Sequence, residues 1–340
     1  EKGWAMTFSA SRRLGNEGFN EGTSYNAYAV FASIEKKINE NHSLNFTGIF
    51  TPNRRGKSSP NTQEVFDLKG IKYNEYWGNL NGKKRNSRIK EVVEPILMFS
   101  HYWNVSENAT LQTNGSYQFG KIGNSRLDFN GGSNPSPSYY QILPSYFLRY
   151  NDLSGAYNAQ ENFVNNGQLN WDRIFDANTT NASVALNNAY VLYEDRNDDK
   201  QFTINTIYNA EINNNISING KLEYKGLRSK NFAEVLDLLG GVGYLDINNF
   251  ADTEVQMQND VLNPNRVVGV GDKFRYNFNL SSVLINAFAQ VQFKYNKIDF
   301  YAAAKISKIT NQREGLDQNG RFENSSFGKS EKLNFINYGI

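Results

Sequence analysis

The chain has 340 residues, with 36 Lys and Arg and 34 Asp and Glu that leave a formal charge of +2. This near-neutral balance gives no electrostatic reason to expect nucleic acid as a partner. The absence of cysteine excludes disulfides and cysteine-ligated zinc. No run of about 18 apolar residues occurs, so a transmembrane helix is excluded. Membrane-spanning β-strands stay open, because half of the residues in such a strand can be polar.

Apolar and polar residues alternate along most of the chain, which is the pattern of strands with two different faces. In one of them, Lys221, Glu223 and Lys225 occupy one face and Leu222 and Tyr224 the other. A short helix is predicted for 233–239, where the apolar residues share one helical face. The predicted strands, about ten in all, are residues 3–12, 27–38, 42–51, 92–104, 109–120, 202–212, 216–226, 276–295 and 298–309, and one that begins near 331.

Short and long connections alternate between these strands. The tight polar turns are 39–41, 106–108, 213–215 and 296–297, and the long connections are 52–91, 121–200, 229–273 and 310–330, after a shorter one near 13–24. Outer-membrane barrels have short periplasmic turns and long extracellular loops, whereas a soluble sandwich has no reason to keep every second loop short. We therefore predict an all-β fold, an antiparallel transmembrane β-barrel in the outer membrane, with these loops extracellular.

An enzyme is not predicted. The sequence has two histidines, His42 beside a short turn and His101 inside a strand, and it contains neither a Gly-x-Ser-x-Gly nor a His-Glu-x-x-His motif. Gly56-Lys57-Ser58 imitates the end of a phosphate-binding loop, but Thr51 stands where its first glycine belongs. No catalytic residue and no required cofactor follow from these patterns.

Several stretches of the long loops resemble TonB-dependent outer-membrane receptors of the Bacteroidota type. The stretches that carry the resemblance are Arg55–Ser58, Lys72–Gly78, Asn81–Arg88, Asn134–Tyr146, Gly269–Phe274, Phe288–Tyr295, Gln312–Gly315 and Gly328–Glu331. The resemblance implies a 22-stranded barrel of a Gram-negative bacterium, with an N-terminal plug on which TonB pulls to import a bound nutrient. It implies lipid, lipopolysaccharide and TonB as partners, and a surface lipoprotein lid is a further candidate partner.

The chain departs from that pattern in two respects. It contains no plug or TonB-contacting segment, and it has about ten strands instead of 22. An open sheet would leave two unpaired edges in lipid, whereas a small closed barrel would be crowded by loops of this size. We therefore expect residues 1–340 to be a partial barrel domain, a fragment of a larger barrel.

Aromatic residues in the long loops are the candidate ligand contacts, because aromatic faces offer large contact area at low entropy cost. Packing of the loops on one another is the alternative role for each of them. The candidates are Trp77, Tyr139, Tyr140 and Trp171. A basic loop patch formed by Lys83, Lys84, Arg85 and Arg88 is a candidate contact for lipopolysaccharide or an acidic ligand.

A run of oxygen-bearing side chains at Asp195, Asn197, Asp198 and Asp199 resembles a calcium-binding loop. It lacks the glycine and the final glutamate of an EF-hand, so a solvated loop tip is the alternative. Calcium is the one candidate cofactor.

Three functions stay open from the sequence. The first is energised import of a nutrient ligand, with this chain as barrel wall and ligand-capturing loops. The second is a passive porin-like or secretion-associated barrel, and the third is a soluble all-β binding or adhesion module. The ligand itself is not encoded in a recognisable motif.

Overall fold

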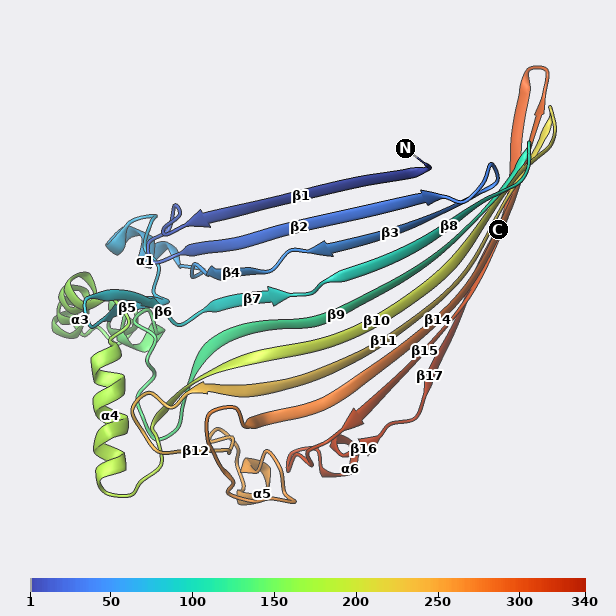
Figure 1. The fold of residues 1–340 in the computed structure, drawn as a ribbon. Helices are drawn as coiled ribbons and strands as arrows, with labels where there is room; N and C mark the ends of the chain where they lie inside the picture. The colour runs from blue at the N-terminus through green and yellow to red at the C-terminus, as the bar shows by residue number, and fades with distance from the viewer. Residues whose placement is uncertain (1) are drawn as a thin grey trace.

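The computed structural model describes residues 2–340, and its main feature is one long, twisted antiparallel sheet (Figure 1). From one edge to the other, the long strands follow chain order, so each is joined to its neighbour by a single connection. The sheet contains thirteen strands: β1 (Trp4–Gly15), β2 (Ser24–Lys37), β3 (His42–Phe50), β4 (Asn53–Gly56), β7 (Ile89–Val93), β8 (Ile96–Ser106), β9 (Ala109–Phe129), β10 (Tyr190–Asn213), β11 (Ile216–Asp237), β14 (Lys273–Tyr295), β15 (Ile298–Gly315), β16 (Gly328–Lys329) and β17 (Leu333–Gly339).

Two prolines account for two of the three strands beyond the ten that the sequence pattern predicts, and the third is the short strand β16. Pro52 separates β3 from β4, and Pro95 separates β7 from β8. A proline has no backbone N–H, so it interrupts the hydrogen-bond ladder. The pairing continues in the same register on both sides of each break, because β3 and β4 both pair with β2, and β7 and β8 both pair with β9.

The two faces of the sheet differ in polarity. Residues paired across strands lie on the same face, and the register aligns Tyr117, Phe202 and Gly226, then Ile204 with Tyr224 and Thr206 with Leu222. This apolar face is solvent-accessible, since Leu222 is 62% exposed and Phe8 of β1 is 65% exposed. On the opposite, polar face, Lys221 pairs with Glu223 at 3.0 Å.

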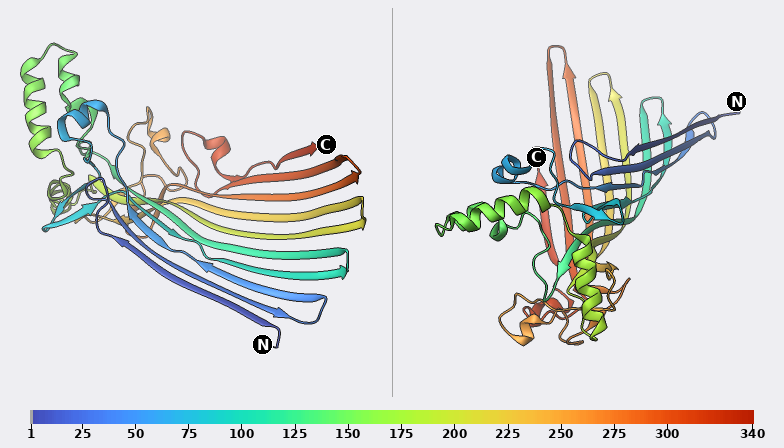
Figure 2. Two further views of the ribbon diagram at one scale, coloured as in Figure 1. Left: turned by 90° about the horizontal axis from the view of Figure 1, so that it is seen from above. Right: turned by 90° about the vertical axis from the view of Figure 1, so that its left-hand side faces the viewer.

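The connections gather at the two ends of the sheet according to their length. The short turns lie at one end, here the short-turn end, and all helices lie at the other, the long-loop end (Figures 1 and 2). The helices are α1 (Gln63–Lys69), the 3₁₀ turn η1 (Tyr140–Ile142), α2 (Pro144–Leu148), α3 (Leu153–Asn166), α4 (Trp171–Ser183), α5 (Glu254–Met257) and α6 (Glu323–Ser326). Two small two-stranded sheets lie beside them. One is the hairpin of β5 (Trp77–Leu80) and β6 (Lys83–Asn86), and in the other β12 (Tyr244–Leu245) pairs with β13 (Val267–Val268) across a long connection that contains α5. None of the helices within residues 2–340 has the length and apolar character needed to cross a bilayer.

Local sequence sets where the loop helices begin. The Asp152 side chain accepts a 2.7 Å hydrogen bond from the Gly155 N–H at the start of α3, and Asn170 does the same for Arg173 at 2.9 Å in α4. Such N-caps satisfy backbone donors that a helix leaves free. Thr62 caps α1 in the same way.

The strands run farther toward the long loops than the alternation pattern predicts. β9 extends to Phe129, β10 begins at Tyr190 and β11 extends to Asp237. The helix predicted for 233–239 is wrong, because most of this segment is the end of β11. Ala233 and Val235 are buried on one face, but Leu236 on the other face is also apolar, so the polar–apolar alternation by which strands are recognised is weak here.

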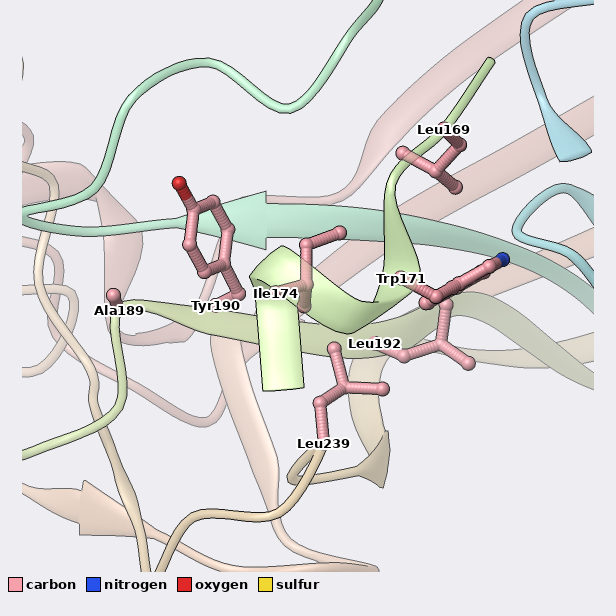
Figure 3. Close-up of a cluster of buried hydrophobic side chains, with 7 residues drawn as sticks. All are labelled: Leu169, Trp171, Ile174, Ala189, Tyr190, Leu192 and Leu239. Carbon is pink, nitrogen blue, oxygen red and sulfur yellow. The ribbon is translucent and has the colours of Figure 1, made fainter. Parts of the chain in front are cut away.

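The hydrophobic core lies in these strand extensions. One cluster packs α4 on one face of β10, through Trp171, Ile174, Tyr190 and Leu192 (Figure 3). A second cluster, which includes Val191, Tyr193, Val235, Tyr244 and Phe274, covers the other face with the β12–β13 connection. The long-loop end is therefore a folded unit with its own core.

Candidate ligand-capturing loops

The candidate site is the set of connections at the long-loop end, called here the loop crown: residues 57–88, 130–189, 238–272 and 316–332. Each sequence-predicted ligand or basic residue lies in it. Their environments differ widely, however, and this separates the residues that hold the crown together from those that present a surface.

Trp171 belongs to the packing of the crown. It begins α4, its side chain is 0% exposed, and it lies between Leu169, Leu192 and Leu239 (Figure 3). Its indole nitrogen donates a 2.9 Å hydrogen bond to the carbonyl oxygen of Arg85. No face of this ring is open to a ligand in this structure, and its predicted alternative role, loop packing, is the one its position supports.

Trp77 is also enclosed, with an exposed fraction of 8%. Gly22, at φ 67°, lies so close that a Cβ there would come within 2.1 Å of the indole Cγ. The ammonium of Lys84 lies 4.6 Å from the ring centre. The indole N–H of Trp77 is buried without a hydrogen-bond partner in the described residues. A buried donor without a partner costs free energy, so this N–H is a point where a water or ligand oxygen would be stabilised.

Tyr139, which is half-buried, and the exposed Tyr140 begin a run of aromatic side chains on the crown. Their ring centres are 4.9 Å apart, and Tyr146 continues the series at 5.9 Å from Tyr140, followed by Tyr150 at 5.4 Å from Tyr146. Tyr140 is 52% exposed. Of the four predicted ligand contacts, these two tyrosines present aromatic area to solvent, and their partners Tyr146 and Tyr150 were not predicted.

A carboxylate fixes the loop that carries these tyrosines. The Glu75 carboxylate accepts hydrogen bonds from the Ser136 and Ser138 hydroxyls, both at 2.5 Å, and from the Ser138 backbone N–H at 3.2 Å. Beside this loop, a polar cavity of about 360 Å³ opens toward α3 and α4 and is lined in part by Pro137, Asn162 and Arg173. The Glu75 carboxylate therefore anchors the loop that carries the two tyrosines and borders the cavity.

A second cavity of about 550 Å³ lies beneath the β5–β6 hairpin. Its charged lining comprises the bases Arg54, Lys84, Arg85, Lys121 and Arg196 and the acids Glu91, Glu194 and Glu234. Burial raises the pKa of Glu194, against the opposing effect of Lys121 and Arg196. Arg196 pairs with Asp198 at 2.8 Å and with Glu234 at 3.0 Å. The cavity therefore offers charges of both signs to a polar ligand.

Lys84 and Arg85 of this lining belong to the predicted basic patch. The charged residues that the long strands contribute, Lys121, Glu194, Arg196 and Glu234, were not predicted, because the sequence pattern indicates loops for 121–200 and 229–273. Arg196, Asp198 and Lys200 continue the two-residue period of β10 above Phe202. Charged residues at every second position, in phase with the apolar residues that follow, were the signal that could have identified this part of the strand.

The four residues of the predicted basic patch have different partners. Lys83 is exposed, Lys84 pairs with Glu17 at 2.6 Å, and Arg85 pairs with Asp237 at 2.6 Å. The Arg88 guanidinium lies 5.1 Å from the Tyr76 ring centre. Lys84 and Arg85 are therefore engaged by carboxylates of this chain, at Glu17 and at the end of β11.

The calcium candidates lie in β10, not at a loop tip as the alternative interpretation held. Asp195 pairs with Arg126 at 2.9 Å and accepts a 2.9 Å hydrogen bond from Tyr276, and Asp198 pairs with Arg196 on the other face. Asn197 bonds to Asn231, and Asp199 faces the same side as Asp195. Across residues 2–340, no three His, Asp or Glu side chains are grouped to hold a metal ion. The four side chains do not form one coordination shell.

A salt-bridged cluster joins two loops of the crown. Arg266 donates to Asp246 at 2.5 Å and lies 4.0 Å from Asp317, whose loop follows β15. Burial raises the pKa of Asp317 to about 6, with help from Asp260 and Asp246 and against the effect of Arg266. The attachment of the 316–332 loop to the 238–272 loop thus includes a carboxyl whose pKa burial raises to about 6.

Comparisons with known proteins agree at the level of fold. No protein-family model matches the chain, and no curated protein is similar to it in sequence. Among solved structures, the open form of the ferric-catecholate import receptor Fiu from E. coli K12 matches with a TM-score of 0.57 and 7% identity, over 99% of this chain and 47% of that one. The siderophore receptor PiuA from Acinetobacter baumannii matches with 0.54 and 10%, over 99% and 42%.

The copper transporter OprC matches with a TM-score of 0.53 and 6% identity, over 99% of this chain and 37% of that chain. The chain thus spans less than half the length of the receptor and transporter structures it matches. At such low identity the likeness concerns the fold alone. Residues 2–340 have the fold of one portion of these proteins, an antiparallel wall of strands together with its long loops.

Proposed function

We propose that this chain forms part of the barrel wall and the ligand-capturing crown of a TonB-dependent importer in the outer membrane. The observation that carries the proposal is the fold likeness, which includes receptors for ferric catecholates and siderophores and a copper transporter and covers 99% of the chain. The Bacteroidota type of the receptor is proposed on the sequence resemblance alone.

The two faces of the sheet support placement in a membrane. An accessible apolar face is costly in water but favourable against lipid hydrocarbon, and the strand ladder satisfies the backbone groups that lipid cannot. On this placement the short-turn end is periplasmic and the loop crown is extracellular. The free edges of β1 and β17, each paired on one side only within residues 2–340, then require further strands.

The crown supports capture of a polar nutrient. The cavity of about 550 Å³ offers both signs of charge, and Tyr139 and Tyr140 lie on the exterior of the same crown. TonB, acting on a plug, would energise release, and a surface lipoprotein would cover the crown; both belong to the proposal.

The test uses the complete protein that carries this chain. It should fractionate with the outer membrane, need detergent for extraction, and conduct little current in a planar bilayer without TonB. Free ion conductance would replace gated import with a porin-like function. Stable solubility without detergent would remove the membrane assignment altogether.

A further inference from the structure

The two histidines of the chain, 59 positions apart, meet on the apolar face near the short-turn end. His42 is the first residue of β3 and His101 lies in β8, the next strand of the sheet. His42 Nδ1 and His101 Nε2 are 3.0 Å apart. One ring must donate its N–H to the other, because two bare nitrogens would repel each other.

The strands hold both rings in place. The register pairs His42 with Trp103 and Leu44 with His101, so the two histidines are diagonal neighbours on one face. The turn fixes the start of β3, because Asn39 Oδ1 accepts a 2.9 Å hydrogen bond from the His42 backbone N–H. Trp103 lies against the other side of the pair, with its ring centre 5.5 Å from that of His42.

Neither histidine ring forms an ion pair or a hydrogen bond with a charged side chain in residues 2–340. Lys36, which is paired in register with Leu44 on the same face, donates to the Lys2 carbonyl oxygen at 2.7 Å and lies 4.8 Å from the centre of the Trp4 ring. In the described part of the chain, neither histidine ring hydrogen-bonds to any side chain except the other. Both rings are partly exposed, and His42 directly follows the 39–41 turn. On the proposed membrane placement the pair therefore lies at the periplasmic rim of the apolar face, where water and a small ion can reach it.

The separation of the nitrogens suits a shared metal ion. Imidazole nitrogens bind zinc-type ions at about 2.0–2.1 Å, so two of them at a right angle around one ion stand about 2.9 Å apart. Imidazole suits Cu²⁺, Ni²⁺ and Zn²⁺, and Cu²⁺ binds most tightly of the three and favours such right-angled, tetragonal positions. With the ring centres 5.2 Å apart and the ring planes 11° apart, the two nitrogens face each other across the hydrogen bond, so both rings must turn about χ2 before their lone pairs converge on one ion. The 3.0 Å separation itself is close to the one that the convergent arrangement needs.

We propose that His42 and His101 form a two-histidine site for a divalent transition-metal ion, with Cu²⁺ bound most tightly. The donating ring moves its hydrogen to its other nitrogen, so both rings bind as neutral ligands and no net proton is released. Water completes the coordination. The ion replaces the hydrogen bond and links β3 to β8 at the end of the sheet where no helix covers it.

The experiment titrates Cu²⁺ into the detergent-solubilised complete protein, purified with a tag that contains no histidine. Binding is followed by electron paramagnetic resonance, whose nitrogen splitting reports imidazole ligands, and by quenching of tryptophan fluorescence. The wild-type protein is expected to show a two-nitrogen signal. His42→Gln and His101→Gln are each expected to weaken the binding at least tenfold, since loss of even an outer-shell partner costs about 10–100-fold in metal affinity.

Trp103→Phe is the matched control that locates the ion. It should keep the two-nitrogen signal but lose the part of the quenching that arises from the indole beside His42. Each variant is checked for the wild-type circular dichroism spectrum, and the two single variants test the site independently if one does not fold. Unchanged affinity in both glutamine variants, or unchanged quenching in Trp103→Phe, would overturn the site.

Discussion

Arg85 and Trp171 hold each other through two different contacts. The guanidinium lies 4.5 Å from the centre of the indole ring, while the indole nitrogen donates a 2.9 Å hydrogen bond to the Arg85 carbonyl oxygen. Asp237, at the end of β11, receives the same guanidinium at 2.6 Å. A residue predicted to face an anionic partner thus connects a hairpin, a helix and the main sheet.

Arg85→Ala is expected to loosen this junction by about 1–3 kcal/mol, through loss of a cation–π contact and a charged hydrogen bond. Arg85→Lys should recover only part of the loss, because an ammonium lacks the planar fork that serves both partners. Hydrogen exchange of the α4 amides measures the effect. Lys83→Ala, two residues away and exposed, is the control, and an equal effect there would show that the junction does not depend on Arg85.

Trp171→Ala and Tyr140→Ala should separate packing from ligand contact. Removal of the buried indole is expected to destabilise the crown by about 3–5 kcal/mol, because the cavity it leaves cannot fully collapse. Tyr140→Ala should change stability by less than about 0.5 kcal/mol, as exposed substitutions usually do. If the proposed function holds, it should also weaken capture of the solute. Protease resistance of the crown and cell uptake are the two readouts. Intact uptake in Tyr140→Ala would remove that tyrosine from the capture surface.

The Asp317 carboxyl makes attachment of the 316–332 loop depend on pH. Its pKa in the folded protein, about 6, is above its ordinary value of 3.8. The protonated form therefore favours the folded state, and this contribution is complete below about pH 4 and is lost as the pH rises through about 6. Asp317→Asn should remove the dependence and stabilise the loop at pH 7.5 by roughly 1–3 kcal/mol. Hydrogen exchange of residues 316–332 at pH 5 and pH 7.5 measures it, and a pH response that persists in the variant would contradict this origin.

The proposed membrane placement predicts opposite responses on the two faces of the sheet. Leu222→Arg puts a charge on the apolar face and should destabilise the barrel by about 2–4 kcal/mol in lipid. Asn205→Arg, on the polar face opposite Glu223, should cost much less. Urea unfolding in liposomes compares them. Equal costs for both substitutions would mean that the apolar face does not contact hydrocarbon.

Alternating polarity and loop length located the long strands because both signals are local or nearly so. Strand ends were harder to predict. The part of β10 before Phe202 carries charged side chains and then, from Tyr190 to Tyr193, packs in the protein core, so the simple alternation of apolar and polar residues is lost there. The burial of Trp171 could not be predicted, because its partner Arg85 is 86 residues distant in sequence. Likewise, nothing in the segments around His42 and His101 indicates that a strand register brings their rings together.

Two tyrosines of β10, Tyr193 and Tyr208, lie in different surroundings. Tyr208 lies on the exposed apolar face, whereas Tyr193 is closed in by Phe274 and by the Arg275 guanidinium, whose centre lies 5.3 Å from its ring. A single hydropathy scale therefore cannot rank substitutions along this strand. On the proposed membrane placement, substitutions near Tyr208 on the apolar face are judged by transfer to lipid hydrocarbon. Substitutions near Tyr193 are judged by the close-packed protein interior, where volume and hydrogen bonding decide the outcome.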